Sequence, residues 1–101
     1  MDVGSAEYQQ QLLRLVPHSS ATKRAEICLL LGQRAQLTAV PHLATLLRTD
    51  PESLVCMAAL RALIEIGDAT ALREIARVAA NDESPVYTVA NDMLKSLKSL
   101  R

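Results

Sequence analysis

The chain has 101 residues, no formal net charge from eleven basic and eleven acidic side chains, and 50% hydrophobic but only 2% aromatic residues. This length suits one small domain, and a core of Leu, Ala, Ile and Val favours closely packed helices over a β-sandwich. The balanced charge disfavours non-specific nucleic-acid binding, which draws its affinity from an excess of basic residues.

Neither a targeting segment nor a membrane span is visible in the sequence. Residues 1–5 lack the basic start and apolar run of a signal peptide. No apolar run approaches the roughly 20 residues needed to span a bilayer. We therefore expect a soluble, cytoplasmic protein that does not enter a membrane.

The spacing of apolar residues predicts an all-α fold of about six helices. They are expected, in chain order, near residues 5–16, 20–33, 38–48, 53–66, 69–80 and 84–99. The fourth is apolar at i, i+3, i+4 and i+7 from Val55 to Leu63, with further apolar residues on its flanks. This helix is therefore expected to be buried over most of its circumference.

Residues typical of helix ends separate these segments. Gly67 suits the left-handed position after a helix, and Asp68 or Thr70 can cap the next one. Pro41 falls in a first helical turn, where its missing N–H is no loss. Ser84-Pro85 is typical of an N-cap followed by proline at the first helical position.

The third and fifth helices are predicted to be two-faced. The third should turn Val40, Leu43, Ala44 and Leu47 inward and His42, Thr45 and Arg48 outward. The fifth should turn Leu72, Ile75, Ala76 and Ala79 inward and Arg73, Glu74 and Arg77 outward.

The chain repeats itself. Val55, Ala59 and Leu63 match Val86, Ala90 and Leu94 at a spacing of 31 residues, and a second overlay gives 32. Units that cannot bury their apolar faces alone stack into a solenoid. We expect a single domain over residues 1–101, divided into a half-unit 5–19, units 20–52 and 53–83, and a terminal capping helix 84–99.

The last helix is sharply amphipathic, with Met93, Leu97 and Leu100 on its apolar stripe. A terminal helix needs one face for the preceding unit and one for water, which predicts a monomer closed by this helix. The alternative is end-to-end association, in which the stripe pairs with a second copy or a partner.

The repeated positions resemble a known family. They comprise Ala39-Val-Pro41, Leu43, Asp50, Val55, Ala58-Ala59, Ala62-Leu63 and Ile66-Gly-Asp68. The pattern resembles the short HEAT-like repeat of phycobilisome lyase subunits and related proteins, over roughly residues 20–98. The resemblance implies an α-solenoid of stacked antiparallel helix pairs.

Three features depart from the family pattern. The repeat of 31–32 residues is shorter than the 40–47 of the larger HEAT and armadillo units. Cys56 stands where the family usually has an arginine. Gln33-Arg34-Ala35 stands where the second unit would predict a Gly-Asp turn.

HEAT-like arrays resemble one another in lining their concave surface with the second helix of each pair. Carried over by position, this predicts a mildly basic partner-binding face. Its residues would be Gln10, Gln11, Arg14, His42, Thr45, Arg48, Arg73, Glu74 and Arg77. We expect an acidic or mixed-charge protein partner, since arginine is a frequent interface anchor. The alternative is an ordinary solvated helix face.

The leading hypothesis is therefore a small adaptor or scaffold that binds a protein on its concave face. The resemblance also implies an alternative, an accessory or lyase-type subunit acting on a phycobilin-bearing protein. Nucleic-acid binding through the four arginines ranks last, and we expect no nucleic-acid partner. No catalytic constellation is visible, so no enzyme activity is predicted.

Other polar residues favour structural roles over chemistry. Asp50, Glu52, Asp82 and Glu83 precede helices, where acids cap the helix and complement its dipole, rather than forming a cation or acid–base site.

Cysteines and histidines are expected to hold no metal or cofactor. Cys28 and Cys56 lie in apolar helical stretches, typical of buried reduced thiols. His18 and His42 form no zinc motif, and no base partner is evident for Ser19 or Ser20. Tyr8 and Tyr87 are expected to cover the edges of terminal helices, or alternatively to anchor a partner.

Overall fold

The computed structural model describes the backbone of residues 5–34, 37–81 and 83–99, and the side chains of residues 7–34, 37–81 and 83–96. Over these residues the chain forms six α-helices, two single-turn 3-10 helices and no β-strand. Their bounds are α1 Ser5–Leu15, η1 Val16–His18, α2 Ala21–Gln33, η2 Leu37–Ala39, α3 Val40–Thr49, α4 Ser53–Ile66, α5 Ala69–Ala79 and α6 Tyr87–Ser99. The all-α prediction is confirmed.

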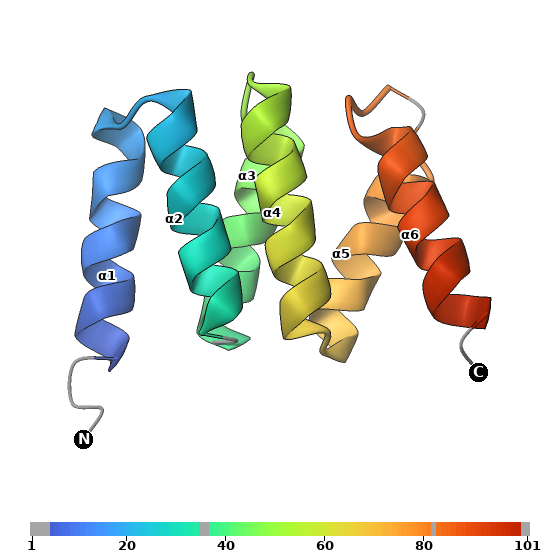
Figure 1. Cartoon of the computed structure of the whole chain (residues 1–101), viewed down its shortest axis with the longest axis horizontal. Helices are drawn as coiled ribbons and strands as arrows, with labels where there is room; N and C mark the ends of the chain where they lie inside the picture. The colour runs from blue at the N-terminus through green and yellow to red at the C-terminus, as the bar shows by residue number, and fades with distance from the viewer. Residues whose placement is uncertain (1–4, 35–36, 82, 100–101) are drawn as a thin grey trace.

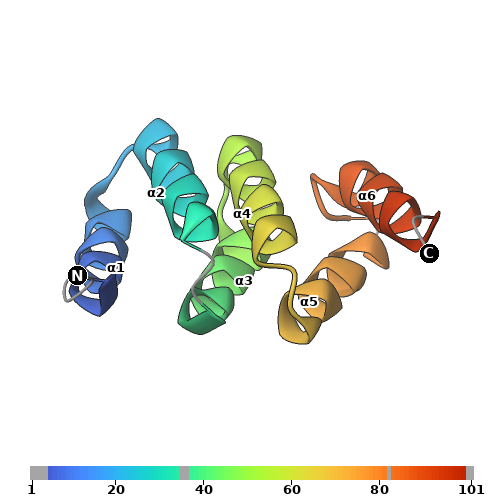
Figure 2. The same cartoon turned by 60° about the horizontal axis from the view of Figure 1, so that its bottom comes forward.

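The helices lie in two layers. Helices α1, α3 and α5 form one layer and α2, α4 and α6 the other, with successive helices alternating between them (Figures 1 and 2). The molecule measures 38 × 30 × 16 Å. The shortest dimension fits two layers whose helix axes are about 8–10 Å apart. This is the layered stack expected of an α-solenoid.

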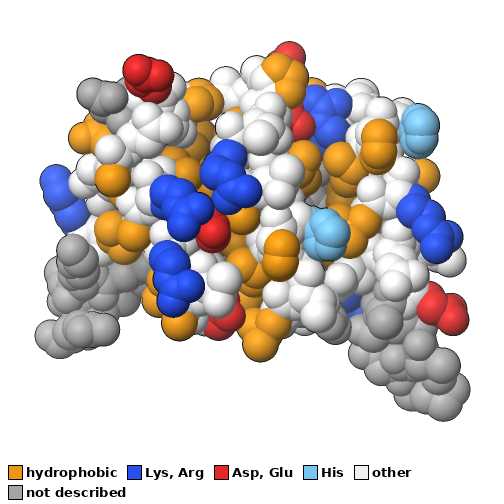
Figure 3. Space-filling view, turned by 180° about the vertical axis from the view of Figure 1, so that it is seen from behind, with side chains coloured by type: hydrophobic (Ala, Val, Ile, Leu, Met, Phe, Trp, Pro, Cys, Tyr) orange, Lys and Arg blue, Asp and Glu red, His pale blue; other side chains and the backbone are white. Residues whose placement is uncertain are grey.

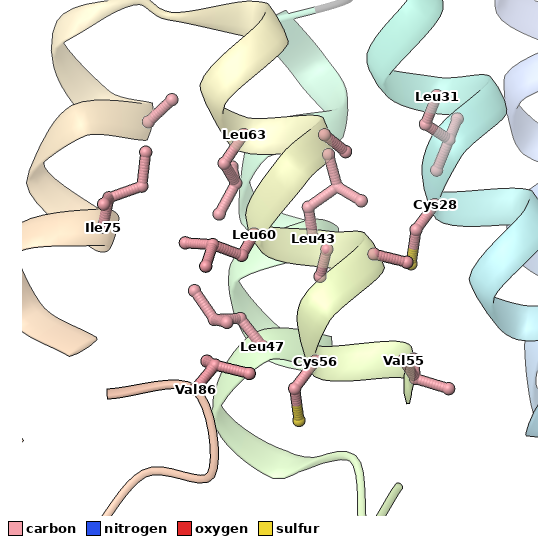
Figure 4. Packing of buried hydrophobic residues seen from close by; sticks show 14 of the residues in the cluster. Cys28, Leu31, Leu43, Leu47, Val55, Cys56, Leu60, Leu63, Ile75 and Val86 are labelled. Carbon is pink, nitrogen blue, oxygen red and sulfur yellow. The ribbon is translucent and has the colours of Figure 1, made fainter. Parts of the chain in front are cut away.

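Helix α4 is the centre of the core. It packs against α2 in its own layer and against α3 and α5 in the other. Its small residues Ala58, Ala59 and Ala62 are buried beside Leu60 and Leu63. Figure 4 shows side chains from α2, α3, α4 and α5 meeting around this helix. The expected burial of this helix is confirmed.

The turn between α4 and α5 forms as its sequence predicts. Gly67 follows α4 with a φ of 65°, in the left-handed region where a Cβ is disfavoured. The Asp68 carboxylate then caps α5 by accepting a hydrogen bond of 2.9 Å from the Ala71 N–H. Pro41 likewise occupies the first turn of α3.

Helix α5 is rotated relative to the prediction. Ala71, Ile75, Val78 and Ala79 are its buried residues, whereas Ala76 is exposed and Leu72 is 36% exposed. The predicted inward positions of Leu72 and Ala76 are therefore wrong. Ala71, Ile75 and Val78 follow the i, i+4, i+7 stripe, and this alternative stripe is also apolar, so sequence spacing alone did not separate the two.

Helix α6 begins later than predicted. Residues 83–86 form a turn in which the Val86 N–H donates to Ser84 Oγ and the Tyr87 N–H donates to the Ser84 carbonyl. Ser84 therefore stabilises a turn before the helix, and the predicted helical start at Ser84-Pro85 is wrong.

Helix α6 is fastened to α5. Val86 and Ala90 are buried, and the Asn91 side chain donates a hydrogen bond of 3.0 Å to the Ala79 carbonyl at the end of α5. That bond satisfies one of the carbonyls left without a partner at the C-terminus of a helix. Asp82 and the side chains of Leu97 and Leu100 lie outside the described residues.

Candidate binding face

A pocket lies between α1 and α3. It has a volume of about 570 Å³ and is framed by two helices of one layer and the 3-10 turn that follows α1. Its lining residues are Gln10, Leu13, Arg14, Val16, Pro17, His42, Thr45 and Leu46. A concavity of this size is within the range that proteins use for ligands and anchoring side chains.

The pocket has an apolar floor and a polar rim. Leu13, Val16 and Leu46 are half-buried and pack against the core with one side, which leaves the other side available to the pocket. Arg14 and His42 are exposed at the rim, and none of the described residues that line the pocket is a carboxylate. Arg14 has no ion-pair partner among the described residues.

The way α1 is held explains why the pocket is open. The first half of α1 is attached to the end of α2 and to η2: the Arg34 guanidinium lies 4.4 Å from the centre of the Tyr8 ring, and Thr38 Oγ1 donates to the buried Gln9 Oε1 over 3.2 Å. Pro17 then lies within the 3-10 turn at the other end of α1. The α1 residues that line the pocket, Gln10, Leu13 and Arg14, follow these contacts and precede Pro17, which also lines it.

Arginines from α3 and α5 form a second feature on the same face. Arg48 Nη1 lies 2.9 Å from Glu74 Oε1, and Arg77 Nη1 lies 3.8 Å from the same oxygen. Arg73 is one turn from Arg77 on α5 and has no ion-pair partner among the described residues. We call Arg48, Arg73, Glu74 and Arg77 the arginine cluster; three positive charges and one negative charge leave it a net charge of two.

Figure 3 shows both features on the α3 and α5 side of the molecule. Basic side chains gather beside an acidic one over one half of this face, and hydrophobic side chains and two histidines are spread over the other half. The two features follow one another along α3, since Thr45 and Leu46 line the pocket and Arg48 belongs to the cluster.

The structure divides the predicted binding residues into these features. Gln10, Arg14, His42 and Thr45 line the pocket, while Arg48, Arg73, Glu74 and Arg77 form the cluster. Gln11 lines a smaller hollow of about 310 Å³ on α1, together with Glu7, Gln10 and Arg14.

Sequence reasoning missed the floor of the pocket. Leu13, Val16 and Leu46 are apolar residues in a periodic pattern, which predicts burial against the core. The only signal of an opening was Pro17, which marks the end of α1 and so limits how far α1 can follow α3.

The acidic residues before α4 have a structural role that differs from the prediction. Glu52 is the residue before α4, but its side chain makes no capping hydrogen bond. Asp50 instead accepts from Arg24 Nε at 2.8 Å, from Arg24 Nη2 at 3.1 Å and from the Glu52 N–H at 3.0 Å. Arg24 also donates to the Ser19 carbonyl at 2.8 Å, so it ties the start of α2 to the turn after α3.

The environment of Asp50 keeps its carboxyl ionised. Burial raises the pKa of Asp50, but hydrogen bonds from Arg24 and from the Glu52 N–H outweigh it and leave the pKa below its ordinary value. The same bidentate contact raises the pKa of Arg24. Asp50 is thus one half of a structural ion pair, and its side chain is only 4% exposed.

Both cysteines are buried free thiols, as predicted. Burial raises the pKa of Cys28 to about 12 and also raises the pKa of Cys56, so both remain protonated and poorly nucleophilic at neutral pH. Figure 4 shows the two sulfur atoms pointing to different parts of the core. Among the described residues, no group of three or more His, Cys, Asp or Glu is placed to hold a metal ion.

Comparison with known proteins gives the family. The model of a family described as HEAT repeats matches residues 9–95, which is most of the chain. The chain therefore belongs to the HEAT repeat family. No curated protein and no solved structure matches it. In the part of the chain that the structure describes, no helix is long and apolar enough to cross a membrane.

Proposed function

We propose that this protein is a small adaptor that binds a segment of another protein on the α1, α3 and α5 face. The observation that carries the proposal is the α1–α3 pocket, because it gathers Gln10, Arg14, His42 and Thr45 around an apolar floor. Helical-repeat proteins commonly use such extended surfaces for binding. Arginine beside apolar area is also a typical composition of interface hot spots.

Two other functions receive less support. A nucleic-acid surface would need more positive charge than the net two of the arginine cluster and aromatic side chains for stacking, whereas the chain contains only Tyr8 and Tyr87. The likeness to phycobilisome lyase subunits stays a prediction, because no feature of the pocket distinguishes a phycobilin-bearing protein from another partner.

The test uses a variant that fills the pocket. Thr45 is an exposed residue of α3 that lines the pocket, so Thr45→Trp should occupy the space without disturbing the core. The matched control is Thr22→Trp, at an exposed position of α2 in the other layer. Both variants should unfold at nearly the same temperature as the wild type, since surface substitutions usually change stability by about 0.5 kcal/mol or less.

The 101-residue chain and both variants would be immobilised, incubated with soluble lysate and compared by quantitative mass spectrometry. We expect one dominant protein that is retained by the wild type and Thr22→Trp, and at least tenfold depleted on Thr45→Trp. Equal recovery on all three proteins, or recovery that disappears on nuclease treatment, would refute the proposal.

A further inference from the structure

The chemistry of the pocket selects the kind of segment that fits it. The floor formed by Leu13, Val16 and Leu46 offers apolar surface to an incoming side chain. Displacing water from such a surface is favourable when apolar atoms replace it, and the gain grows with the apolar area that is buried. A large aliphatic or aromatic side chain is therefore the group that gains most from entering.

The charges around the pocket favour an acidic neighbour for that side chain. Arg14 is exposed at the rim, and the described residues that line the pocket include no carboxylate. On the other side, Glu74 is shared between Arg48 and Arg77, whereas Arg73 has no ion-pair partner among the described residues. An incoming carboxylate can thus pair with Arg73 without displacing Glu74.

The spacing of the two features limits the length of the segment. Thr45, on the pocket, belongs to α3, whereas Arg73, in the cluster, belongs to α5, which packs against α3; the axes of packed helices are about 8–10 Å apart. An extended peptide advances about 3.3 Å per residue, and arginine side chains reach several ångströms further. An anchor in the pocket therefore places residues about two to four positions away beside the arginine cluster.

Taking the adaptor function as its basis, we infer that the pocket binds a segment of another protein with one large apolar side chain and a carboxylate about two to four residues from it. The apolar side chain enters between α1 and α3, and the carboxylate pairs with Arg73. An RNA or DNA strand carries a phosphate at every nucleotide and gains its affinity from many basic contacts, which a net charge of two in the arginine cluster does not supply.

The first part of the test selects ligands from a display library of random twelve-residue peptides on the 101-residue chain. We expect the enriched peptides to share Leu, Phe or Trp with Asp or Glu about two to four positions away. Enriched peptides that are basic, or a selection that enriches no peptide, would overturn the inference.

The second part measures one enriched, fluorescently labelled peptide by anisotropy against charge variants. Arg73→Glu should weaken binding by about fivefold or more, because it removes one exposed ion pair and adds repulsion. The matched control is Arg61→Glu, at an exposed position of α4 in the other layer, and should leave affinity within about twofold. Raising the salt concentration should weaken wild-type binding more than that of Arg73→Glu.

The outcomes separate this inference from the proposed function. A peptide that loses binding on Thr45→Trp but is indifferent to Arg73→Glu would keep the pocket as a binding site and overturn the acidic ligand. A peptide that binds Thr45→Trp as tightly as the wild type would overturn both. A single-stranded DNA of twenty nucleotides that binds more tightly than every peptide would also overturn both.

Discussion

Two neighbouring pairs of helices in one layer pack in different ways. Helix α2 lies along α4, and a Cβ built on Gly32 would stand only 2.7 Å from Ala62 Cα and 2.8 Å from Ala62 Cβ. Helix α6 packs against α5 instead (Figure 1), and a pocket of about 340 Å³ lies between α6 and α4. One pair is in close contact and the other is open.

The repeat explains the difference in terms of side-chain volume. At spacings of 32 and 31 residues, Ile64 occupies the position of Gly32 and Met93 that of Ala62. Ile64 and Met93 both line the pocket between α4 and α6. Two small residues let the helix backbones approach, whereas two large ones hold them apart. The residues at one pair of repeat positions therefore set how closely neighbouring helices pack: α2 and α4 lie close together, and α4 and α6 lie further apart.

The largest expected effect comes from the core around α4. Leu63 on α4 is fully buried, so Leu63→Ala should reduce the free energy of unfolding by about 2–5 kcal/mol. Met93→Ala, at a half-buried position beside the open pocket, should cost less than half as much. Urea denaturation followed by far-UV circular dichroism measures both. Equal costs would mean that α6 is packed as tightly as α4.

A smaller effect is expected from adding one methyl group at the close contact. Gly32→Ala places a Cβ against Ala62 and should destabilise the chain by about 0–2 kcal/mol, because overpacking costs about 1–3 kcal/mol while alanine regains roughly 1 kcal/mol of helix propensity. Thr22→Ala, on an exposed turn of the same helix, is the control and should be neutral or slightly stabilising. A stabilised Gly32→Ala protein would contradict the close approach.

The ion pair between Arg24 and Asp50 should have a pH-dependent effect on the stability of the fold. Because the folded protein lowers the pKa of Asp50 below about 3.8, the pair stabilises the fold above that pH and this contribution is lost as the pH falls through the folded value. Asp50→Asn should therefore lower the thermal midpoint by several degrees at pH 7 and by progressively less below pH 4. A constant difference between wild type and variant across this range would argue against the ion pair.

The thiols should give an effect on stability at alkaline pH. The pKa of Cys28 is raised from 9.0 to about 12 in the fold, so its contribution to stability is present below about pH 9 and is lost as the pH rises toward 12. Cys28→Ala should make the urea midpoint less sensitive to pH between 9 and 11. Rapid reaction of the native protein with a thiol reagent at pH 8 would contradict the burial of both thiols.

The order of the helices could be predicted from the sequence, because the residues that start and end helices act locally. Gly67 and Asp68 act on the backbone within a few residues, and both take the positions that their chemistry predicts. The rotation of α5 and the close approach of α2 depend on partners far away in the chain. Sequence spacing alone therefore does not show that Ala76 is exposed or that Gly32 is tightly packed.

The candidate site was predictable in part for the same reason. Position in the repeat placed Thr45 and Arg48 on an exposed face of α3, where the structure has them. The pocket itself depends on how α1 is tethered at Tyr8 and Gln9, which requires contacts with residues more than 25 positions away. The sharing of Glu74 between Arg48 and Arg77 likewise needs the α3–α5 distance.

The hydrogen bond from Asn91 to the Ala79 carbonyl has a mechanical consequence. Helix α6 is fastened to α5 by this bond and by buried Val86 and Ala90, and an open pocket lies between it and α4. A force applied to the C-terminal end is therefore transmitted through α5 to the turn at Gly67. Under tension the last two helices should detach together as one mechanical unit, and the α2–α4 contact should be among the last to yield.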